Sequence, residues 1–446
     1  MITSREVALR LLILVESKKV KADEALDEIF NKTALSQKDR SLAFQLAYGV
    51  LRWRGRLDWI LENFSQYPLS KLTPWIRNIL RLGAYQLLFL TKIPSWAAVS
   101  ESVKLAHRFG HKGTSSLVNG ILRKIETMKG AVNTPTQLSN NVEFISRWYS
   151  HPEWLVRRWV KRFGIEGTKS ILEANNQIPP LTVRVNTKKI VVKDFLLRLE
   201  EKGIKASPCE MAEHGLKLEV SVLELGQFLE SGLCVIQDEA SMLVSQLIRP
   251  EPGINVLDVC AAPGGKTSHM AQLMGDKGIV LAMDGNFKRL RLLKENVRRL
   301  GFNCVKMVCQ DARQPISPKI AADLVLIDAP CSAFGVLRRH PEIKWLKEEP
   351  ELQRLGKVQE EILGNVCQNV KPDGRLAYSV CSFEPEETLG VVNNFLKSHP
   401  NFSLVHLGQL FCGKMGDFLS EEGFFQVLPG QSEMDGFFMA CLTRIT

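Results

Sequence analysis

Two cysteines in short, distinctive settings are the residues of this chain best suited to covalent chemistry. Cys331 lies in Asp-Ala-Pro-Cys-Ser directly after the apolar run 324–327, and Cys381 lies in Tyr-Ser-Val-Cys-Ser directly after 374–377. Both follow a predicted buried strand, at the edge where open α/β sheets bind their ligands. Two thiols near an acidic residue, Asp328, predict nucleophilic attack on an electrophilic carbon. The alternative for each is a buried cysteine that packs as a small apolar side chain.

A loop of small residues follows the first strand predicted in the second half of the chain. It reads Asp-Val-Cys-Ala-Ala-Pro-Gly-Gly-Lys-Thr from 258 to 267. Its glycines let the backbone approach a ligand closely. A Walker A loop would need glycine where this chain has Cys260, and the dinucleotide fingerprint G-x-G-x-x-G is absent. Both pyrophosphate-binding loops are therefore excluded.

Two aspartates end the next two predicted strands and add to this loop. Asp284 ends the second strand, where a carboxylate can hold ribose hydroxyls, and Asp311 ends the third, where it could accept from an adenine amino group. Taken alone, each is more simply an N-cap or turn residue. As an ordered set with the loop, they favour an adenosyl cofactor without a pyrophosphate, which is S-adenosylmethionine.

The elements that must position these residues alternate regularly from residue 254. Strands are predicted at 255–260, 278–284, 305–310, 322–328 and 374–380, and helices near 267–274, 287–300, 350–370 and 386–397. This alternation predicts a mostly parallel, doubly wound α/β sheet. We expect 424–428 and 436–443 to form a closing antiparallel pair.

The first part of the chain predicts a different architecture. Residues 4–129 place apolar side chains at helical spacing, with Ser36 as an N-cap, and the polar stretch from about 131 to 146 predicts a linker. Residues 181–230 alternate short strand-like and helix-like segments. The predicted domains are an all-α domain at 1–132, a linker with a basic helix at 133–165, a small α+β RNA-binding subdomain at 166–240 and a catalytic domain at 241–446.

The net charge of +10 comes entirely from the first 130 residues. They hold 21 basic and 11 acidic residues, whereas the rest of the chain holds 37 of each. Such asymmetry predicts a polyanion-binding module joined to a neutral enzyme, and the alternative is a lysine-rich solvated surface. Candidate RNA contacts are Arg52, Arg54 and Arg56 around Trp53, and Arg157 and Arg158 in a second basic cluster. Alternatively, Trp53 packs inward and the arginines snorkel around it.

The bulk composition indicates a reduced, intracellular environment. No apolar stretch reaches the roughly 20 residues of a membrane span, and the amino terminus lacks the apolar core of a signal peptide. All ten cysteines lie after residue 208 without a regular spacing. We therefore expect free thiols, a cytoplasmic location and no metal site.

These motifs, in this order, resemble the bacterial 16S ribosomal RNA cytosine-5 methyltransferases whose amino-terminal domain is similar to the antitermination factor NusB. The segments that carry the resemblance, besides the helical first domain, are 180–186, 235–241, 258–267, 328–332, 335–345, 378–387 and 435–438. The resemblance implies a NusB-like helical domain and a Rossmann-like class I methyltransferase domain. It also implies transfer of a methyl group from S-adenosylmethionine to C5 of cytosine 967 in 16S ribosomal RNA.

The resemblance also implies roles for individual residues. Cys381 is the nucleophile, and Cys331 assists later. The cofactor contacts are Cys260, Ala261, Ala262, Pro263, Gly264, Gly265, Lys266, Asp284, Asp311 and Asp328. Three positions depart from the family's usual residues, namely Ala333, Val380 and Thr388, and none of them removes a reacting atom.

The chemistry explains why such a site needs two thiols. C5 of cytosine is a poor nucleophile until a thiolate adds at C6, and we assign this addition to Cys381. Asp328, protonated or sharing a proton with N3, with Lys266 nearby, would stabilise the charge on the ring. Cys331 would then help to release the methylated base. The base must leave its stack, which favours a single-stranded loop with a flipped cytosine as substrate.

Other interpretations remain beside this one. Arg338 and Arg339 either contact RNA phosphates or belong to a solvated loop. A transfer-RNA cytosine-5 methyltransferase would carry similar catalytic motifs. An RNA-binding ribosome assembly factor is the non-enzyme alternative, which the intact cysteines and cofactor loop disfavour. We expect a monomer.

Overall fold

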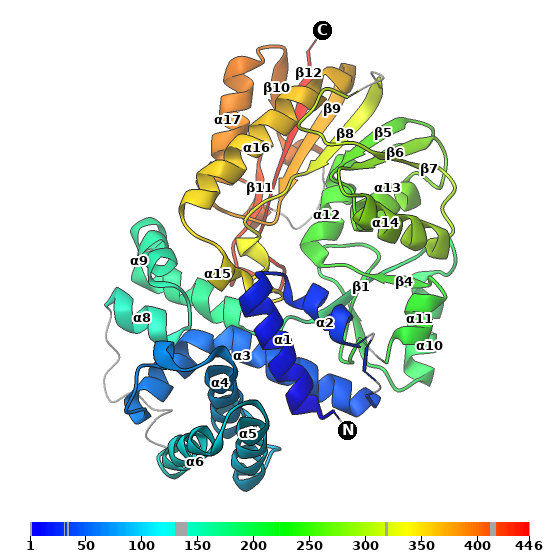
Figure 1. Ribbon diagram of the computed structural model, residues 1–446. Helices are drawn as coiled ribbons and strands as arrows, with labels where there is room; N and C mark the ends of the chain where they lie inside the picture. The colour runs from blue at the N-terminus through cyan, green and yellow to red at the C-terminus, as the bar shows by residue number, and fades with distance from the viewer. Residues whose placement is uncertain are drawn as a thin grey trace. The chain divides into compact units, whose positions relative to one another are not determined.

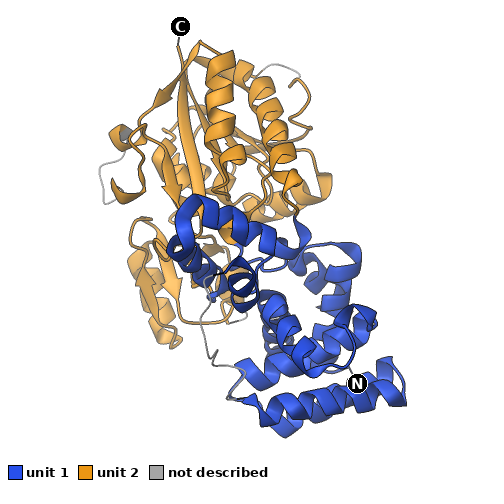
Figure 2. Ribbon diagram, turned by 90° about the vertical axis from the view of Figure 1, so that its left-hand side faces the viewer, with its two compact units in different colours: residues 1–178, 337–347 blue, residues 179–336, 348–446 orange. Residues whose placement is uncertain are grey.

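The computed structural model describes residues 2–30, 32–33, 35–129, 141–222, 224–316, 320–410 and 416–445. The chain divides into two compact units (Figure 2), one formed by Met1–Ile178 with Leu337–Lys347 and the other by Pro179–Val336 with Glu348–Thr446. The predicted fold class is confirmed, because an all-α unit accompanies a small α+β sheet and a mostly parallel sheet. No helix in the described ranges is long and apolar enough to cross a membrane.

The first unit is helical throughout its described part (Figure 1). Its elements are α1 (Ser4–Lys18), α2 (Ala22–Phe30), α3 (Gln37–Phe64), η1 (Leu69–Lys71), α4 (Pro74–Phe89), α5 (Ser95–Phe109), α6 (Lys112–Thr127), α8 (Val142–Trp148), α9 (Glu153–Asn176) and α15 (Ile343–Leu346). Ser36 caps α3 as predicted, because its hydroxyl accepts from the amide of Asp39. Buried Leu9, Leu46 and Ile79 show the apolar faces of α1, α3 and α4 meeting in one core.

The end of the polar stretch predicted as a linker, 131–146, is helical. Residues 133–140 lie outside the described residues, but 142–148 form helix α8. Asn141 caps this helix by accepting from the amide of Phe144 at 2.6 Å. Phe144 and Trp148 then pack edge-on against Trp59 of α3, with ring centroids 6.2 and 6.5 Å away. The aromatic contacts make this polar stretch a helix of the first unit, and α9 continues the unit beyond the predicted boundaries at 132 and 165.

The second unit begins with a small antiparallel sheet of strand order β2-β3-β1-β4. Its strands are β1 (Leu181–Val185), β2 (Ala206–Pro208), β3 (Gly215–Leu218) and β4 (Cys234–Ile236), and its helices are α10 (Val192–Glu201) and α11 (Gly226–Glu230). Val183, Phe195, Leu216 and Phe228 bury their side chains in a core of their own. This is the small α+β arrangement that residues 181–230 predicted.

The large sheet of the second unit has the strand order β10-β12-β9-β8-β5-β6-β7, with β11 paired to β12. Its strands are β5 (Asn255–Val259), β6 (Ile279–Asp284), β7 (Val305–Cys309), β8 (Ala322–Asp328), β9 (Val370–Val380), β10 (Phe402–Val405), β11 (Phe425–Val427) and β12 (Phe437–Arg444). The five strands from β7 to β9 are parallel, and β12 closes the sheet antiparallel to β9. The chain order therefore reverses between β5 and β8, which is where such sheets bind ligands.

Helices cover both faces of this sheet (Figure 1). The helices are α12 (Glu239–Ile248), α13 (Gly265–Leu273), α14 (Phe287–Leu300), α16 (Pro350–Val366), α17 (Leu389–Ser398) and the short α18 (Leu407–Leu410); the short 3-10 turns are η2 (Phe334–Val336), η3 (Cys367–Asn369), η4 (Pro385–Glu387) and η5 (Gly416–Phe418). Alternate residues of β8 face opposite sides: Leu326 packs in the core that contains Leu293 of α14, and Val325 packs in the core that contains Ile362 of α16. Helices on both faces explain why the parallel strands are nearly continuous apolar runs.

Two strands differ from the sequence-based expectation. β9 begins at Val370, four residues earlier than predicted, because Val370 pairs with Ala322 of β8. β10 was not predicted, since its four residues are too few to show a clear pattern; it pairs with β12 from Phe402 to Val405. The closing antiparallel pair is confirmed as β11 and β12.

Candidate active site

The two cysteines meet at the carboxyl ends of two neighbouring strands. β8 and β9 run parallel with Asp328 opposite Ser379, so the loops that leave them begin side by side. The Sγ atoms of Cys331 and Cys381 lie 3.2 Å apart, and both side chains are partly exposed. The fold thus joins two thiols that are fifty residues apart in sequence into one site.

The two thiols have different electrostatic surroundings. The pKa of Cys331 is raised well above its ordinary value, first by the hydrogen bond with the Cys381 sulfur and then by burial and the negative charge of Glu387. Because a thiol must ionise to act as a nucleophile, this environment keeps Cys331 protonated. A protonated Cys331 can donate to the Cys381 sulfur and so stabilise negative charge there.

A carboxylate and an ammonium group lie at the same edge of the sheet. Asp328, the last residue of β8, accepts from Lys266 Nζ at 2.7 Å and from the Ser379 hydroxyl at 3.1 Å. The Lys266 side chain is 11% exposed and that of Asp328 is 34% exposed, so the pair can be reached from solvent. Lys266 comes from the first turn of α13, which connects the predicted cofactor loop to the predicted catalytic carboxylate.

The small-residue loop after β5 turns sharply before α13 begins. The amide of Ala261 donates to Met283 O at 3.0 Å, and the amide of Gly264 donates to Ala261 O at 2.9 Å. Gly264 has φ +101°, and a Cβ there would lie 2.9 Å from Leu293 of α14. Glycine is therefore required at 264 both by the left-handed backbone and by the close helix. Asn296 of α14 donates to Pro263 O at 3.0 Å and holds the outside of the turn.

A cavity of about 250 Å³ opens beside this loop. Its lining includes Cys260, Asp284 and Asp311 from the ends of β5, β6 and β7. Its apolar wall is formed by Pro330 after β8 and by Leu355 and Val358 of α16, among others. A cavity lined by carboxylates and by apolar side chains offers the two kinds of contact that a ribose and a flat base need.

The two aspartates of the cavity already have partners in the protein. Asp284 is 5% exposed and accepts from the amide of Ala262 at 3.2 Å and that of Asn286 at 2.8 Å. It thereby also ties the cofactor loop to β6. Asp311 pairs with the guanidinium of Arg313 at 2.6 Å, which lowers the pKa of this carboxyl group. Backbone amides thus hold the Asp284 carboxylate in place, and the Arg313 guanidinium holds that of Asp311. Both carboxylates can accept further hydrogen bonds.

Sequence reasoning missed Asp258 as a functional candidate. It lies within β5, is fully buried and accepts from the Thr267 hydroxyl at 2.5 Å. Its Oδ1 atom has no hydrogen-bond partner in the described part of the chain. Burial raises the pKa of Asp258 to about 7. The signal available in the sequence was a single acid inside an otherwise apolar strand.

Arg184 is a second missed residue. This β1 side chain is fully buried and donates to Gln237 at 2.8 Å, to Ser268 at 2.8 Å and to Gln272. Ser268 and Gln272 belong to α13, so one guanidinium joins the small sheet to the helix that follows the predicted cofactor loop. Burial lowers the pKa of Arg184 to about 9. Only the fold reveals this role, since Val-Arg-Val is an ordinary strand sequence.

Comparison with known proteins identifies the family. Residues 245–443 match the family described as 16S rRNA methyltransferase RsmB/F, residues 2–127 match the NusB family, and residues 151–223 match an RsmF/B-like ferredoxin-like domain. The probable ribosomal RNA small subunit methyltransferase B of Bacillus subtilis is 35% identical over 99% of this chain and 98% of its own length. The chain belongs to the ribosomal RNA small subunit methyltransferase B family.

Two further similarities agree with this assignment and confirm the predicted resemblance. The ribosomal RNA small subunit methyltransferase B of Salmonella arizonae is 34% identical over 92% of both chains. The crystal structure of PH0851 is 28% identical and covers 99% of both chains with a TM-score of 0.82. The predicted methyltransferase and helical domains therefore both belong to this family's architecture.

The arginines around Trp53 do not form the exposed surface that the sequence suggested for this family member. Arg52 and Arg56 are each 8% exposed. Arg52 donates to Arg338 O at 2.6 Å, and the guanidinium of Arg56 lies 3.6 Å from the centre of the Trp148 ring. Arg54 lies 5.3 Å from the Trp345 ring centre. Arg52 and Arg56 thus lie in the interior of the helical unit, so we correct their predicted role as exposed phosphate contacts; Arg54 is half-buried and stays a candidate.

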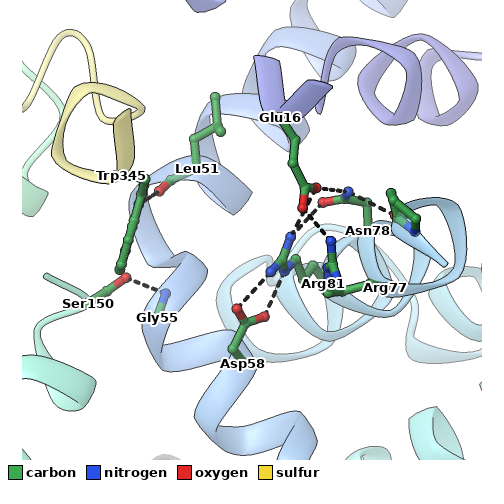
Figure 3. Close-up of polar contacts among 10 residues, drawn as sticks. Glu16, Leu51, Gly55, Asp58, Arg77, Asn78, Arg81, Ser150 and Trp345 are labelled. Atoms are coloured by element: carbon green, nitrogen blue, oxygen red, sulfur yellow. Dashed lines mark hydrogen bonds and ion pairs between the residues drawn. The ribbon is translucent and has the colours of Figure 1, made fainter. Parts of the chain in front are cut away.

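The segment 337–347 belongs to the helical unit although it follows Cys331 in the sequence. The Trp345 indole donates to Leu51 O at 2.9 Å, and the Ser150 hydroxyl accepts from the amide of Gly55 at 2.9 Å, one turn further along α3 (Figure 3). Lys344 is fully buried and donates to Arg52 O at 2.9 Å and Asn176 Oδ1 at 3.2 Å. Residues 337–347, which interrupt the chain of the second unit, thus contribute buried side chains to the helical unit.

A second group of polar contacts joins α1, α3 and α4 (Figure 3). Arg81 of α4 is 3% exposed and pairs with Asp58 at 2.6 Å, while Asn78 donates to Glu16 at 2.8 Å. Arg77 also pairs with Glu16. These contacts thus pair the buried guanidinium of Arg81 with a carboxylate of helix α3.

The other predicted RNA contacts differ in exposure. Arg157 of α9 is exposed and pairs with Glu153 of the preceding turn, while Arg158 and Arg339 are half-buried. Arg338 is 6% exposed, so its side chain does not present a free surface. Arg157, Arg158 and Arg339 remain candidates for contact with RNA phosphates.

Proposed function

We propose that this protein transfers a methyl group from S-adenosylmethionine to C5 of a cytosine in 16S ribosomal RNA through a covalent adduct with Cys381. The single observation that carries this proposal is the pair of thiols 3.2 Å apart, beside the Lys266–Asp328 ion pair. Family membership supports the methyl transfer and the ribosomal substrate. By resemblance to the family, the target is cytosine 967.

The residues around the cavity fit the proposed cofactor. Asp284 and Asp311 offer carboxylate oxygens for ribose hydroxyls and an adenine amino group, and Cys260 and the apolar wall formed by Pro330 and Leu355 leave room for the base. Gly264 and Gly265 bring the backbone close at the start of α13. When bound, S-adenosylmethionine supplies an electrophilic methyl group. The residues from Cys260 to Lys266, with Asp284, Asp311 and Asp328, would hold it.

In the proposed first step, the Cys381 thiolate adds to C6 of the cytosine. The new S–C6 bond pushes the ring electrons toward N3 and O2, and C5 becomes nucleophilic. Asp328 lies beside Lys266, so this pair can supply a proton and positive charge to that edge of the ring. Cys331, kept protonated, can donate a hydrogen bond to the Cys381 sulfur during this step.

Once C5 has received the methyl group it carries both this group and its proton, so the release step needs a base for the C5 proton. Once Cys381 is bonded to C6, its sulfur no longer carries charge or a proton toward Cys331. The first cause of the raised pKa of Cys331 is then removed, so this thiol can lose its proton to solvent. The thiolate of Cys331 accepts the C5 proton, the C5–C6 double bond re-forms, and Cys381 leaves as a thiolate.

Adduct trapping tests these assignments. Methyl transfer from labelled S-adenosylmethionine to 16S ribosomal RNA, followed by mapping of the modified base, should identify a cytosine methylated at C5. Cys331→Ala should accumulate a covalent protein–RNA complex, and Cys381→Ala should form none. Cys309→Ser, at an exposed thiol at the end of β7, is the matched control and should behave as wild type. An adduct in Cys381→Ala, or none in Cys331→Ala, contradicts the roles assigned here.

The principal alternative is another RNA substrate. Methyl transfer to transfer RNA with none to 16S ribosomal RNA would keep the chemistry and reject the proposed substrate. RNA binding without any methyl transfer by the intact chain would favour an assembly factor.

A further inference from the structure

The Glu387 side chain contacts both the loop after β8, which carries Cys331, and the loop after β9, which carries Cys381. Glu387 ends the short 3-10 turn η4, six residues after Cys381, and is completely buried. Its Oε1 atom accepts from the amide of Ser332 at 2.6 Å, and its Oε2 atom accepts from the Ser332 hydroxyl at 2.5 Å. Oε2 also accepts from the Ser382 hydroxyl at 2.6 Å. One carboxylate therefore contacts both loops.

The two serines are the immediate neighbours of the two thiols. Ser332 follows Cys331 and Ser382 follows Cys381, and the two hydroxyl oxygens lie 3.2 Å apart. Both serines are at most 1% exposed, so water does not compete for these bonds. Glu387 holds the amide and hydroxyl of Ser332 and the hydroxyl of Ser382, so it restrains the residue after each cysteine and with it the reach of each thiol.

The carboxylate is itself held from the opposite side. Gln359 of α16 donates to Glu387 Oε1 at 3.4 Å and to Pro330 O at 2.9 Å. The Tyr378 hydroxyl donates to Glu387 O at 2.6 Å and lies 3.0 Å from Gln359 Oε1. Gln359 and Tyr378 are themselves completely buried. A rigid helix and a central strand thus define where the carboxylate sits.

Burying a carboxylate is costly, and a structural loop contact could be made by a neutral side chain. An amide in its place has a single acceptor oxygen, whereas here two oxygens receive three hydrogen bonds from Ser332 and Ser382. Only a carboxylate of this length satisfies all three donors at once. Hydrogen bonds to a charged acceptor are also shorter and stronger than neutral ones.

We propose that Glu387 is a positioning residue, which sets the separation of the Cys331 and Cys381 thiols by binding the residue that follows each of them. It touches neither thiol and takes no part in proton transfer. This inference rests on the proposed function for its catalytic consequence, although the thiol separation itself can be measured without RNA or cofactor.

The direct test measures how readily the two thiols form a disulfide in the full-length protein. In glutathione redox buffers, the equilibrium between the dithiol and the Cys331–Cys381 disulfide reports the effective concentration of one thiol at the other. Peptide mass spectrometry identifies this disulfide among the other cysteines. Glu387→Ala should lower the effective concentration at least tenfold, and Ser382→Ala should lower it less. Glu386→Gln, at the neighbouring carboxylate of the same turn, is the matched control and should stay within twofold of wild type.

Catalytic measurements separate positioning from a general loss of structure. Glu387→Gln keeps the size of the side chain and should lower kcat tenfold or more while KM for RNA changes less than threefold. In a Cys331→Ala background, it should also slow formation of the covalent RNA complex. If Glu387→Ala folds poorly, Glu387→Gln and Ser382→Ala still decide the question by the glutathione measurement.

The outcomes distinguish the two proposals. An unchanged effective concentration in both Glu387→Gln and Ser382→Ala overturns the positioning role, whatever the cysteines do. A lowered effective concentration with no covalent RNA complex in Cys331→Ala supports the positioning role and rejects the catalytic roles proposed for the cysteines.

Discussion

Replacing Gly55 with alanine should destabilise the helical unit, although the same change normally stabilises a helix. Gly55 lies inside α3, where alanine is favoured over glycine by about 0.8–1 kcal/mol. A Cβ at this position would lie 2.9 Å from the Trp345 ring, 3.3 Å from Ser150 Cα and 3.4 Å from Ser150 Oγ. Real Cβ atoms essentially never lie within 3.0 Å of such an atom, so either the Trp345 ring or the helix must move.

Neither neighbour can move at low cost. The Trp345 ring is held by its hydrogen bond to Leu51 O and by the guanidinium of Arg54, and Ser150 is completely buried (Figure 3). Overpacking of this kind costs about 1–3 kcal/mol. Because the gain in helix propensity offsets part of this cost, Gly55→Ala should lower the free energy of unfolding by about 1 kcal/mol.

Gly120 provides the matched control. It lies inside α6, and a Cβ there would have no atom within 4 Å. Gly120→Ala should therefore stabilise the protein by about 0.8–1 kcal/mol. The assay is chemical denaturation, with hydrogen exchange of the α3 and α6 peptides reporting each helix separately because a two-unit chain need not unfold in one step.

A double-mutant cycle with Trp345→Phe locates the clash. The smaller ring removes the atom nearest to Gly55, so Gly55→Ala should cost at least about 1 kcal/mol less in that background. Stabilisation by Gly55→Ala equal to that of Gly120→Ala would refute the reasoning. So would an equal cost of Gly55→Ala in the wild-type and Trp345→Phe backgrounds, because the indole ring would then not lie against α3.

Two further predictions concern buried charges. Burial raises the pKa of Asp258 from 3.8 to about 7, so the folded state holds a proton that the unfolded state has lost, and stability should fall as pH rises through this window. Urea denaturation should show that the free energy of unfolding of Asp258→Asn, relative to that of wild type, rises by about 2–3 kcal/mol between pH 5 and pH 7. If this difference stays constant, Asp258 is ionised in the folded protein. Burial and the charge of Arg52 hold the pKa of Lys344 well below its usual value, so the unfolded state binds the extra proton and wild-type stability should rise with pH above that lowered pKa. Below pH 10 the wild-type free energy of unfolding should rise by up to about 1.4 kcal/mol per pH unit. Lys344→Met should remove this pH dependence. Identical pH profiles for the two proteins would contradict a buried neutral amine.

Local patterns in the sequence were enough to predict most elements of the fold. Apolar runs bounded by small and acidic residues predicted β5, β6, β7 and β8, because strands that are buried on both faces consist almost entirely of apolar residues. The predicted cofactor loop follows β5, and the two cysteines follow β8 and β9. Strand β10 was not predicted, because four residues are too few to show a clear periodicity.

Contacts between distant segments could not be predicted in the same way. The arginines of α3 look like a nucleic-acid surface in sequence, yet Arg52 and Arg56 are buried because segment 337–347 and Trp148 cover them. Nothing in the spacing of residues 337–347 indicates that they leave the sheet unit to pack with helices. Burial of an arginine depends on its neighbours in space, which a single helix cannot specify.

The sequence by itself determined which reactive groups this protein carries, because the identity of each group is local. Cys331, Cys381, Asp328 and the small-residue loop were recognisable from their immediate neighbours. Only the tertiary structure decided how those groups are held: the 3.2 Å between the thiols depends on the parallel pairing of β8 with β9 and on a buried Glu387 that contacts both loops. Distance and burial arise from packing between segments far apart in the chain, and these set the reactivity of side chains whose types the sequence already shows.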